Sequence, residues 1–519
     1  MQRSTAHTIR LALVISLGGF IFGFDASVIS GAIRFVTAEF DLSDFQLGLV
    51  VGAPTLGGIL TALAAGPLSD LYGRRTMLRI VAALYLVSAV SSALAQSFEM
   101  LVAARFLGGM AFASLALAPM YISEVAPAKH RGRLVSFNQL NIVLGFSAAY
   151  FANYFLLGAA ESGATWASEL GIVDNTWRWM LGLEILPAGL WLIALFFVPE
   201  SPRWLIINGH EERGRAVLQH LTLDKSLDEE VADIIESSHG DAPSLGARIR
   251  TVFGPTLRMS LVVGLVLAVG QQITGINVVF FYAPSIFEQS GIGTNAAFAQ
   301  AVVVGVVNVI FTLVSMVLID RMGRKPLLLI GLGGILFSML LCSWSFHQAE
   351  YRLEPDAVAQ LENQDVAAQL QPMLGVDYDN DVLFKQALVE AIGAEETRRL
   401  QSDLIQSAIA IDPVLVLIGI LAFVASFAVS LGPVMWVMLP EIFPNRVRGV
   451  AMAVTGTVNS AVSFGVQFIF PWQLNNTGAA NTFLGYALFA LLFFALVLWL
   501  VPETKNKTLE ELEAELRGG

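Results

Sequence analysis

A carboxylate lies inside the first long apolar segment of the chain, at Asp25 in the run Phe22-Gly-Phe-Asp-Ala-Ser27. A charge near the middle of a membrane costs about 3 kcal/mol on insertion scales, so this aspartate should face protein and not lipid. Arg105, at the start of the fourth apolar segment, is the natural partner. A carboxylate that releases the arginine when protonated and rebinds it when ionised would be a proton switch. A static buried ion pair is the alternative.

Amide side chains gather in the seventh apolar segment, where Gln271, Gln272 and Asn277 fall within seven residues. They follow one helix face only loosely, and the segment of about 33 residues is too long to cross a bilayer unbroken. We therefore expect a break at Gly275. A few amides in an apolar wall are typical of a site for a small polar ligand. Hydrogen bonding between helices is the alternative role for an asparagine.

Three charged motifs occur twice, in the same order: Asp70-Leu-Tyr-Gly-Arg-Arg75 with Asp320-Arg-Met-Gly-Arg-Lys325, Glu124-Val-Ala-Pro127 and Arg131 with Glu441-Ile-Phe-Pro444 and Arg448, and Pro199-Glu-Ser-Pro-Arg203 with Pro502-Glu-Thr-Lys505. Ordered recurrence indicates two repeated halves. Carboxylates and arginines at helix ends could pair and hold a gate closed. Membrane orientation and helix capping are the alternative explanation.

The composition indicates which elements position these residues. Of 519 residues, 55% are hydrophobic and 14% charged, with a mean hydropathy of +0.67; soluble proteins carry about 25% charged residues. Most of the chain must therefore meet lipid or other apolar helices. The single cysteine, Cys342, excludes an intramolecular disulfide and is expected to be buried. We find no phosphate loop, metal cluster or nucleophile–base pair, so we expect no enzyme, no catalytic or metal-binding residue, no cofactor besides a proton, and no nucleic-acid partner.

Apolar runs long enough to cross a membrane predict twelve spans, at residues 10–33, 46–68, 77–97, 100–122, 135–158, 177–199, 256–288, 297–319, 326–347, 412–439, 449–472 and 479–501. The first is too long for a signal peptide and should be retained. Alternate short loops are basic, and these should be cytoplasmic: they hold Arg74, Arg75, Arg79, Lys129, Arg131, Arg133, Arg321, Arg324, Lys325, Arg446 and Arg448. In this cell-membrane protein both termini should then lie in the cytoplasm, and segment 350–411 should lie on the outer side.

The motifs resemble those of the sugar porter family of the major facilitator superfamily: Pro199-Glu-Ser-Pro-Arg-Trp-Leu205, Gln271-Gln-Ile-Thr-Gly-Ile-Asn277 and Pro440-Glu-Ile-Phe-Pro444. The pattern is similar to bacterial xylose–proton symporters and, more distantly, to animal facilitative glucose transporters. The resemblance implies an all-α integral-membrane fold of two six-helix halves. We expect an N-terminal half at 1–199, a cytoplasmic helical linker at 200–255 and a C-terminal half at 256–519.

The resemblance also implies roles for individual residues. Sugar would be bound by Gln271, Gln272, Asn277, Asn308, Trp436, Asn459 and Phe22, and proton coupling would rest on Asp25 and Arg105. A cytoplasmic gate network would contain Asp70, Arg74, Arg75, Glu124, Arg131, Glu200, Arg203, Asp320, Arg324, Glu441, Arg448 and Glu503. Within it, Asp70, Arg75, Glu124 and Arg131 would form one cluster, and Asp320, Arg324, Glu441 and Arg448 its mate.

Three positions depart from the xylose symporter pattern. Phe146 stands in place of a glutamine, Phe281 in place of a tyrosine beside Tyr282, and Ser460 in place of a tryptophan. Loss of a buried hydrogen-bonding group changes selectivity strongly, so the substrate should differ from the pattern's.

The segment from Glu350 to Asp412 holds 13 acidic and 4 basic residues. We expect an outer insertion at 350–411 with short amphipathic helices, for example near Leu383 to Ile409. A solvated excursion whose removal leaves transport intact is the simpler interpretation. A lid or a partner-binding element is the alternative.

Together these features predict a monomeric, proton-coupled symporter of a monosaccharide (hexose or pentose) or a polyol, working by alternating access in the lipid bilayer. A facilitative uniporter and a transporter-like sugar receptor are the alternatives. Accumulation against a gradient would separate them.

Overall fold

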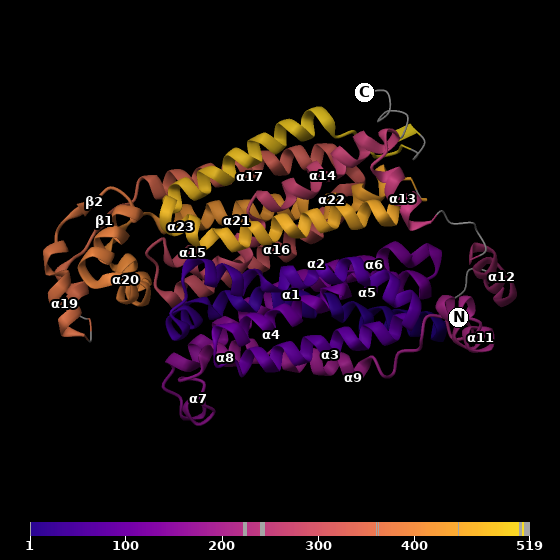
Figure 1. The fold of residues 1–519 in the computed structure, drawn as a ribbon, viewed down its shortest axis with the longest axis horizontal. Coiled ribbons are helices and arrows are strands. Elements are labelled where there is room, and N and C mark those ends of the chain that lie inside the picture. The colour runs from indigo at the N-terminus through magenta and orange to yellow at the C-terminus, as the bar shows by residue number, and fades with distance from the viewer. Residues whose placement is uncertain are drawn as a thin grey trace.

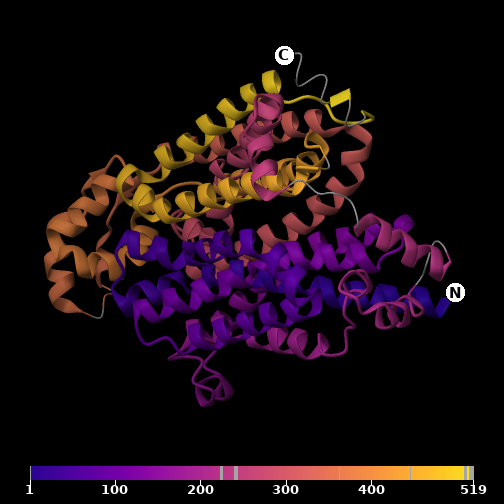
Figure 2. The same cartoon turned by 45° about the vertical axis from the view of Figure 1, so that its right-hand side comes forward.

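The computed structural model describes residues 2–221, 226–238, 244–359, 361, 363–444, 446–507 and 511–512. Two bundles of long helices lie side by side, the N-terminal one indigo to purple and the C-terminal one pink through orange to yellow in Figure 1. The short helices α11 and α12 lie at one end of the molecule, and α19 and α20 lie at the opposite end (Figures 1 and 2).

The N-terminal bundle consists of α1 (Gln2–Phe40), α2 (Asp44–Tyr72), α3 (Arg74–Ala93), α4 (Phe98–Met110), the 3-10 turn η1 (Ala111–Ala113), α5 (Ser114–Val125), α6 (Ala128–Glu161), α7 (Thr165–Glu169), α8 (Thr176–Gly182) and α9 (Ile185–Ala194). The polar stretch that follows forms α10 (Pro202–Ile207), α11 (Glu211–Leu218), α12 (Leu227–Ser238) and α13 (Leu245–Val252).

The C-terminal bundle consists of the 3-10 turn η2 (Pro255–Leu257), α14 (Arg258–Ile273), α15 (Ile276–Glu288), α16 (Thr294–Met322), α17 (Arg324–His347), α21 (Pro413–Val429), α22 (Leu431–Ile442) and α23 (Arg448–Leu500). Between α17 and α21 lie β1 (Glu350–Arg352), α18 (Pro355–Ala359), α19 (Gln364–Leu370), η3 (Gln371–Met373), β2 (Asp377–Tyr378), α20 (Asp381–Ala408) and β3 (Ile409–Ala410).

Ten helical segments of the described residues are long and apolar enough to cross a membrane. The difference from the twelve predicted spans has two causes. α23 is continuous through the last two spans, with a kink at Gly478 where φ is 83°. The sixth span is divided into α8 and α9 by a turn at Leu183 and Glu184. The expected all-helical membrane fold is confirmed.

Two glycines repeat the same geometry in the two bundles. Gly73 and Gly323 follow α2 and α16 with φ of 92° and 95°, a region that side chains other than glycine disfavour. A Cβ atom would lie 2.5 Å from a carboxylate oxygen of Glu200 at Gly73 and 2.6 Å from one of Glu503 at Gly323. The motif repeat read from the sequence is therefore a repeat of structure, with glycine required at both places.

The inserted segment is a small folded body, which the expectation of a solvated excursion did not include. Its three strands form an antiparallel sheet in the order β2-β1-β3. Buried side chains, among them Tyr351, Leu370, Phe384 and Ile405, form a core separate from those of the bundles. The amphipathic helix expected near 383–409 is α20, broken at Gly393 where φ is 80°.

Candidate functional site

The predicted break at Gly275 is present. This residue separates α14 from α15 with φ of 93°, and the ring of Tyr486 lies 3.1 Å from the position of a Cβ atom. The break brings Gln272, at the end of α14, next to Asn277, in the first turn of α15: the Asn277 side-chain nitrogen donates to Gln272 Oε1 at 2.9 Å. Glycine is required here both by its backbone angle and by the close aromatic ring.

A connected amide network surrounds this break. Gln272 Nε2 donates to Gln271 Oε1 and to Asn459 Oδ1, each at 3.2 Å. Asn459 Nδ2 donates to Gln271 Oε1 at 2.9 Å and to the carbonyl of Ala268 at 2.8 Å. All three side chains belong to buried residues. Four of the predicted sugar-binding residues, Gln271, Gln272, Asn277 and Asn459, are thus brought together.

Two residues that the sequence reading missed extend the network along α23. Asn277 Nδ2 donates to Ser463 Oγ at 2.6 Å, and Gln467 Nε2 donates to the same oxygen at 2.7 Å. Gln467 Oε1 accepts from Thr55 Oγ1 of α2 at 3.2 Å, so the network reaches the other bundle. Asn459, Ser463 and Gln467 lie four residues apart, and this spacing of polar residues in an apolar helix was a usable signal.

The remaining predicted sugar contacts lie apart from this network. Asn308 of α16 is buried, and no described hydrogen bond joins it to the amides. Trp436 of α22 is 45% exposed, so protein atoms leave nearly half of this residue uncovered. Phe22 of α1 packs edge-on against Phe112, with ring centroids 4.6 Å apart.

The first two departures from the xylose pattern contact each other. The rings of Phe146 on α6 and Phe281 on α15 are stacked, with their centroids 6.4 Å apart and their planes at 7° to each other. Both residues are buried. Beside them, Tyr150 donates its hydroxyl to the carbonyl of Phe280 at 2.5 Å. An apolar contact between the bundles therefore occupies this wall, whereas Ser460 lies on α23 and is partly buried.

Asp25 and Arg105 form the ion pair that the sequence predicted. Asp25 Oδ1 lies 2.7 Å from Arg105 Nη1, and the two side chains are 1% and 2% exposed. Asp25 Oδ2 and Arg105 Nε have no hydrogen-bond partner among the described residues. The pair is therefore buried but incompletely satisfied, which leaves the carboxylate an oxygen on which to take a proton.

A second buried carboxylate, Glu184, belongs to the same place and was missed from the sequence. It lies at the turn between α8 and α9, is 2% exposed, and is close enough to Asp25 and Arg105 to interact with both. Its Oε1 atom has no partner among the described residues. One arginine thus faces two carboxylates. A glutamate in the middle of the sixth predicted span was the signal that could have found it.

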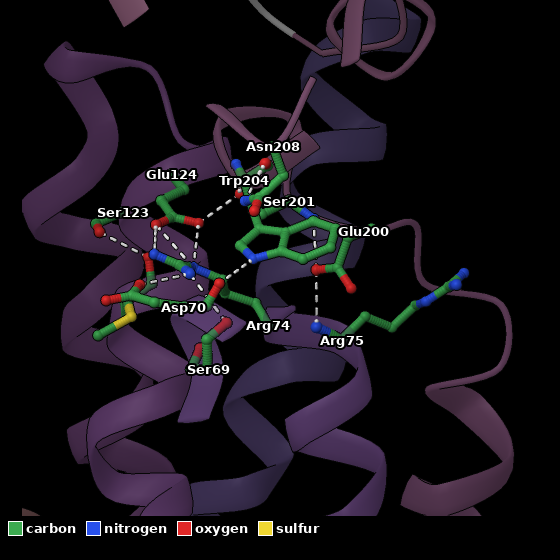
Figure 3. Close-up of polar contacts among 11 residues, drawn as sticks. Ser69, Asp70, Arg74, Arg75, Ser123, Glu124, Glu200, Ser201, Trp204 and Asn208 are labelled. Atoms are coloured by element: carbon green, nitrogen blue, oxygen red, sulfur yellow. Dashed lines mark hydrogen bonds and ion pairs between the residues drawn. The ribbon is translucent and has the colours of Figure 1, made fainter. Parts of the chain in front are cut away.

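The first of the two charged clusters, which the sequence predicts to be cytoplasmic, is built on Arg74. Its guanidinium lies 2.7 Å from Asp70 and 3.0 Å from Glu124. Glu124 also accepts the hydroxyl hydrogen of Ser201. The prediction that Arg75 pairs in this cluster was wrong: Arg75 contributes only its backbone N–H, which donates to Glu200 at 2.9 Å, and its side chain extends away from Glu124 (Figure 3).

The second cluster repeats these contacts in the C-terminal bundle. Arg324 lies 2.8 Å from Glu441 and 3.8 Å from Asp320, and Thr504 Oγ1 donates to Glu441 at 2.5 Å. Glu503 accepts from the backbone N–H groups of Arg324 and Lys325, each at 3.1 Å.

The other predicted members of the network are placed less centrally. Arg448 begins α23 and donates to the carbonyl of Phe443 at 3.4 Å, not to a carboxylate. Arg203 lies exposed in the first turn of α10. The side chain of Arg131 lies outside the described residues. Each cluster therefore forms its described ion pairs within its own bundle.

Polar contacts between the bundles lie at the opposite end, which carries the inserted segment and which the sequence predicts to be the outer one. Asn475 of α23 donates to Asp44 of α2 at 2.7 Å, and Arg34 of α1 donates to Thr294 of α16 at 2.6 Å. Asn295 donates to Glu161 between α16 and α6. These bonds hold the bundles together at this end, and the Tyr150 and Thr55 contacts join the bundles nearer the amide network.

Comparisons with known proteins show what the chain is similar to. The family model for sugar (and other) transporters matches residues 11–353 and 402–516. The arabinose-proton symporter of Bacillus subtilis is 33% identical over 99% of this chain and 96% of that protein. The D-xylose-proton symporter of Escherichia coli K12 is 33% identical over the same shares. The inward-open structure of the E. coli xylose transporter XylE aligns with a TM-score of 0.74 and 31% identity, covering 98% of this chain and 99% of that one.

Proposed function

The chain belongs to the family of sugar (and other) transporters, and we propose that it is a proton-coupled symporter of a monosaccharide or polyol, working by alternating access. The observation that carries the coupling is the buried ion pair of Asp25 and Arg105, 2.7 Å apart. A buried ion pair is costly in a membrane protein because neither charge has water around it, and its presence therefore indicates a function.

The amide network supports a sugar as the substrate. Amides both donate and accept hydrogen bonds, as sugar hydroxyls do, so Gln271, Gln272, Asn277 and Asn459 can exchange bonds among themselves for bonds to a ligand. Relatives are named for arabinose and xylose transport. The Phe146–Phe281 contact removes a polar group from the first-half wall, which favours a substrate with fewer hydroxyl contacts on that side.

In the proton step, a proton binds the free Oδ2 of Asp25 and the carboxylate loses its charge. The attraction of Arg105 for Asp25 weakens, and the arginine turns toward the second carboxylate, Glu184. Release of the proton on the other side of the membrane restores the original pair. The network Thr55–Gln467 connects movement of the bundles to the sugar site, because it joins α2 to α23.

The two cytoplasmic clusters brace the helix ends at the inner gate, each within its own bundle, and the contacts between the outer ends of the bundles act as the outer gate. Both termini lie in the cytoplasm, following the basic short loops. The transporter works as a monomer in the cell membrane and needs no cofactor besides the proton. Sugar is translocated unchanged, so the protein is not an enzyme.

Addition of sugar to lightly buffered vesicles tests this proposal. D-xylose, L-arabinose and D-glucose are added in turn to vesicles that contain the protein, and the external pH is recorded. Symport predicts a rise of external pH on adding a transported sugar, which an uncoupler abolishes. Sugar entry without any pH change would instead make the protein a uniporter.

A further inference from the structure

The inserted segment 350–411, here named the outer strap, contacts both bundles. We propose that it stabilises the closed outer gate: it is anchored to the C-terminal bundle and forms ion pairs with the outer end of α1. The inference rests on the alternating-access function proposed above, because a gate must open for a strap to have an effect. The contacts also favour the lid interpretation of this segment over a passive excursion.

The strap is anchored to α23 of its own bundle. Its Lys385 forms a buried ion pair with Asp381 at 2.8 Å and donates to the carbonyl of Leu474 at 3.5 Å. A carboxylate oxygen of Asp381 lies 2.5 Å from where a Cβ of Gly478 would be, so the strap packs against the kink of α23. Gln401 donates to Asn475 at 3.0 Å. The separate core of the strap lets it move with this bundle as one body.

Two ion pairs join the strap to the other bundle. Asp403 accepts two hydrogen bonds from Arg34 of α1, at 2.9 and 3.2 Å. Arg398 donates two to Asp41, just after the end of α1, both at 3.0 Å. In the Arg398–Asp41 pair, two guanidinium nitrogens each donate to a different carboxylate oxygen, the bidentate geometry that fixes the orientation of such pairs. In the Arg34–Asp403 pair, the single nitrogen Nη2 donates to both carboxylate oxygens. They lie beside the contacts that close the outer ends of the bundles.

Arg34 is the link between the strap and the gate itself. Besides Asp403 it donates to Thr294 of α16, and its guanidinium lies 3.9 Å from Glu288 at the end of α15. Glu288 is 3% exposed, and its Oε1 has no hydrogen-bond partner among the described residues. The strap thus supplies a carboxylate that holds Arg34 in place over the contact of α1 with α15 and α16.

The effect on the gate follows from which contacts break. If the outer ends separate, the anchor to α23 stays intact, whereas the bonds from the strap to Arg34 and Asp41 are lost. Only this difference between the two states can shift their populations. The four side chains are 35–52% exposed, and an exposed ion pair shifts an equilibrium by about 1.4- to 5-fold. Two pairs should therefore favour the closed outer gate by about 2- to 30-fold.

Labelling of a cysteine at the interface of α2 and α23 tests this. Thr55→Cys is introduced with Cys342→Ala in the full-length chain, and a membrane-impermeant thiol reagent is added from outside without sugar. The strap variant is Asp403→Asn with Arg398→Gln. Arg399→Gln is the matched control, because Arg399 is 71% exposed and its described ion pair, with Glu396 at 3.8 Å, lies within the strap.

The parent is the protein with Thr55→Cys and Cys342→Ala alone. We expect the strap variant to be labelled 2- to 30-fold faster than the parent, and the control to be labelled at the parent's rate. In a second variant, Arg398→Asp with Asp41→Arg replaces Arg398→Gln, while Asp403→Asn is kept. This exchange of charges should return the labelling rate toward that of the parent. An unchanged rate in the strap variant overturns the proposal, as does an equal rise in the control. Because no sugar is present, this outcome is independent of whether the protein is a symporter.

Discussion

The guanidinium of Arg74 lies 3.0 Å from the carboxylate of Glu124, and their side chains are 11% and 9% exposed. The neighbouring Arg75 reaches the same region only through its backbone N–H. Two adjacent arginines in one motif thus do different things: the first neutralises a nearly buried carboxylate, and the second presents a main-chain donor that any residue but proline could supply.

Arg74→Ala should therefore destabilise the protein, and Arg75→Ala should have little effect. Removing Arg74 leaves Glu124 nearly buried without its cation, at a cost of about 3 kcal/mol. The measurement is thermal unfolding of the two purified variants in the same detergent. Equal melting temperatures for Arg74→Ala and Arg75→Ala would show that the side-chain pair is unimportant.

Gln272→Ala and Trp436→Ala should each weaken sugar binding while the protein stays folded. A lost hydrogen bond in a buried polar site costs about 1–3 kcal/mol, or roughly 5- to 160-fold in affinity. Calorimetry with the sugar that drives the largest uptake measures this. Thr457→Ala is the control, because its hydroxyl bonds only to the carbonyl of Ala453 on the same helix. Full affinity in both site variants would place the pocket elsewhere.

Stability should depend on pH through Glu503. Burial alone would raise the pKa of this carboxylate, but hydrogen bonds from the backbone N–H groups of Lys505, Arg324, Lys325 and Thr504 outweigh it and hold the pKa below its ordinary 4.5. A lowered pKa stabilises the folded state above 4.5, and this stability is lost as the pH falls through the folded-state pKa.

Glu503→Gln should therefore melt at a lower temperature than the parent at pH 7, and the difference should stay constant down to about pH 4.5 and narrow below it. Melting curves of both proteins across this range measure the difference. A gap that does not change with pH in the acidic range would mean that the charge of Glu503 contributes nothing.

The repeated motifs allowed much of this architecture to be predicted. Because these motifs are short, charged and in fixed order, they located both charged clusters and implied two halves. They could not separate Arg74 from Arg75, because adjacent residues on a helix point in different directions and the choice depends on where Glu124 and Glu200 are placed in space. The break at Gly275 was predictable because length and amide spacing both required it.

Other features were missed for physical reasons. The strands of the inserted segment are two or three residues long, too short for an alternating pattern. Glu184 is the acidic residue of the predicted span 177–199, and only the fold brings it to Asp25. Ser463 and Gln467 belong to the site because α23 carries them on the same face as Asn459, a relation visible once the helix is known.

In the proposed mechanism the Asp25–Arg105 pair couples sugar to the proton, and accumulation of sugar in proteoliposomes under an inward proton gradient measures this coupling. The wild-type protein should concentrate sugar above the external level, and an uncoupler should abolish this. Asp25→Asn should exchange labelled sugar for unlabelled sugar across the membrane but only equilibrate it. Accumulation by Asp25→Asn to the wild-type level, or mere equilibration by the wild type, would show that this pair does not couple sugar to the proton.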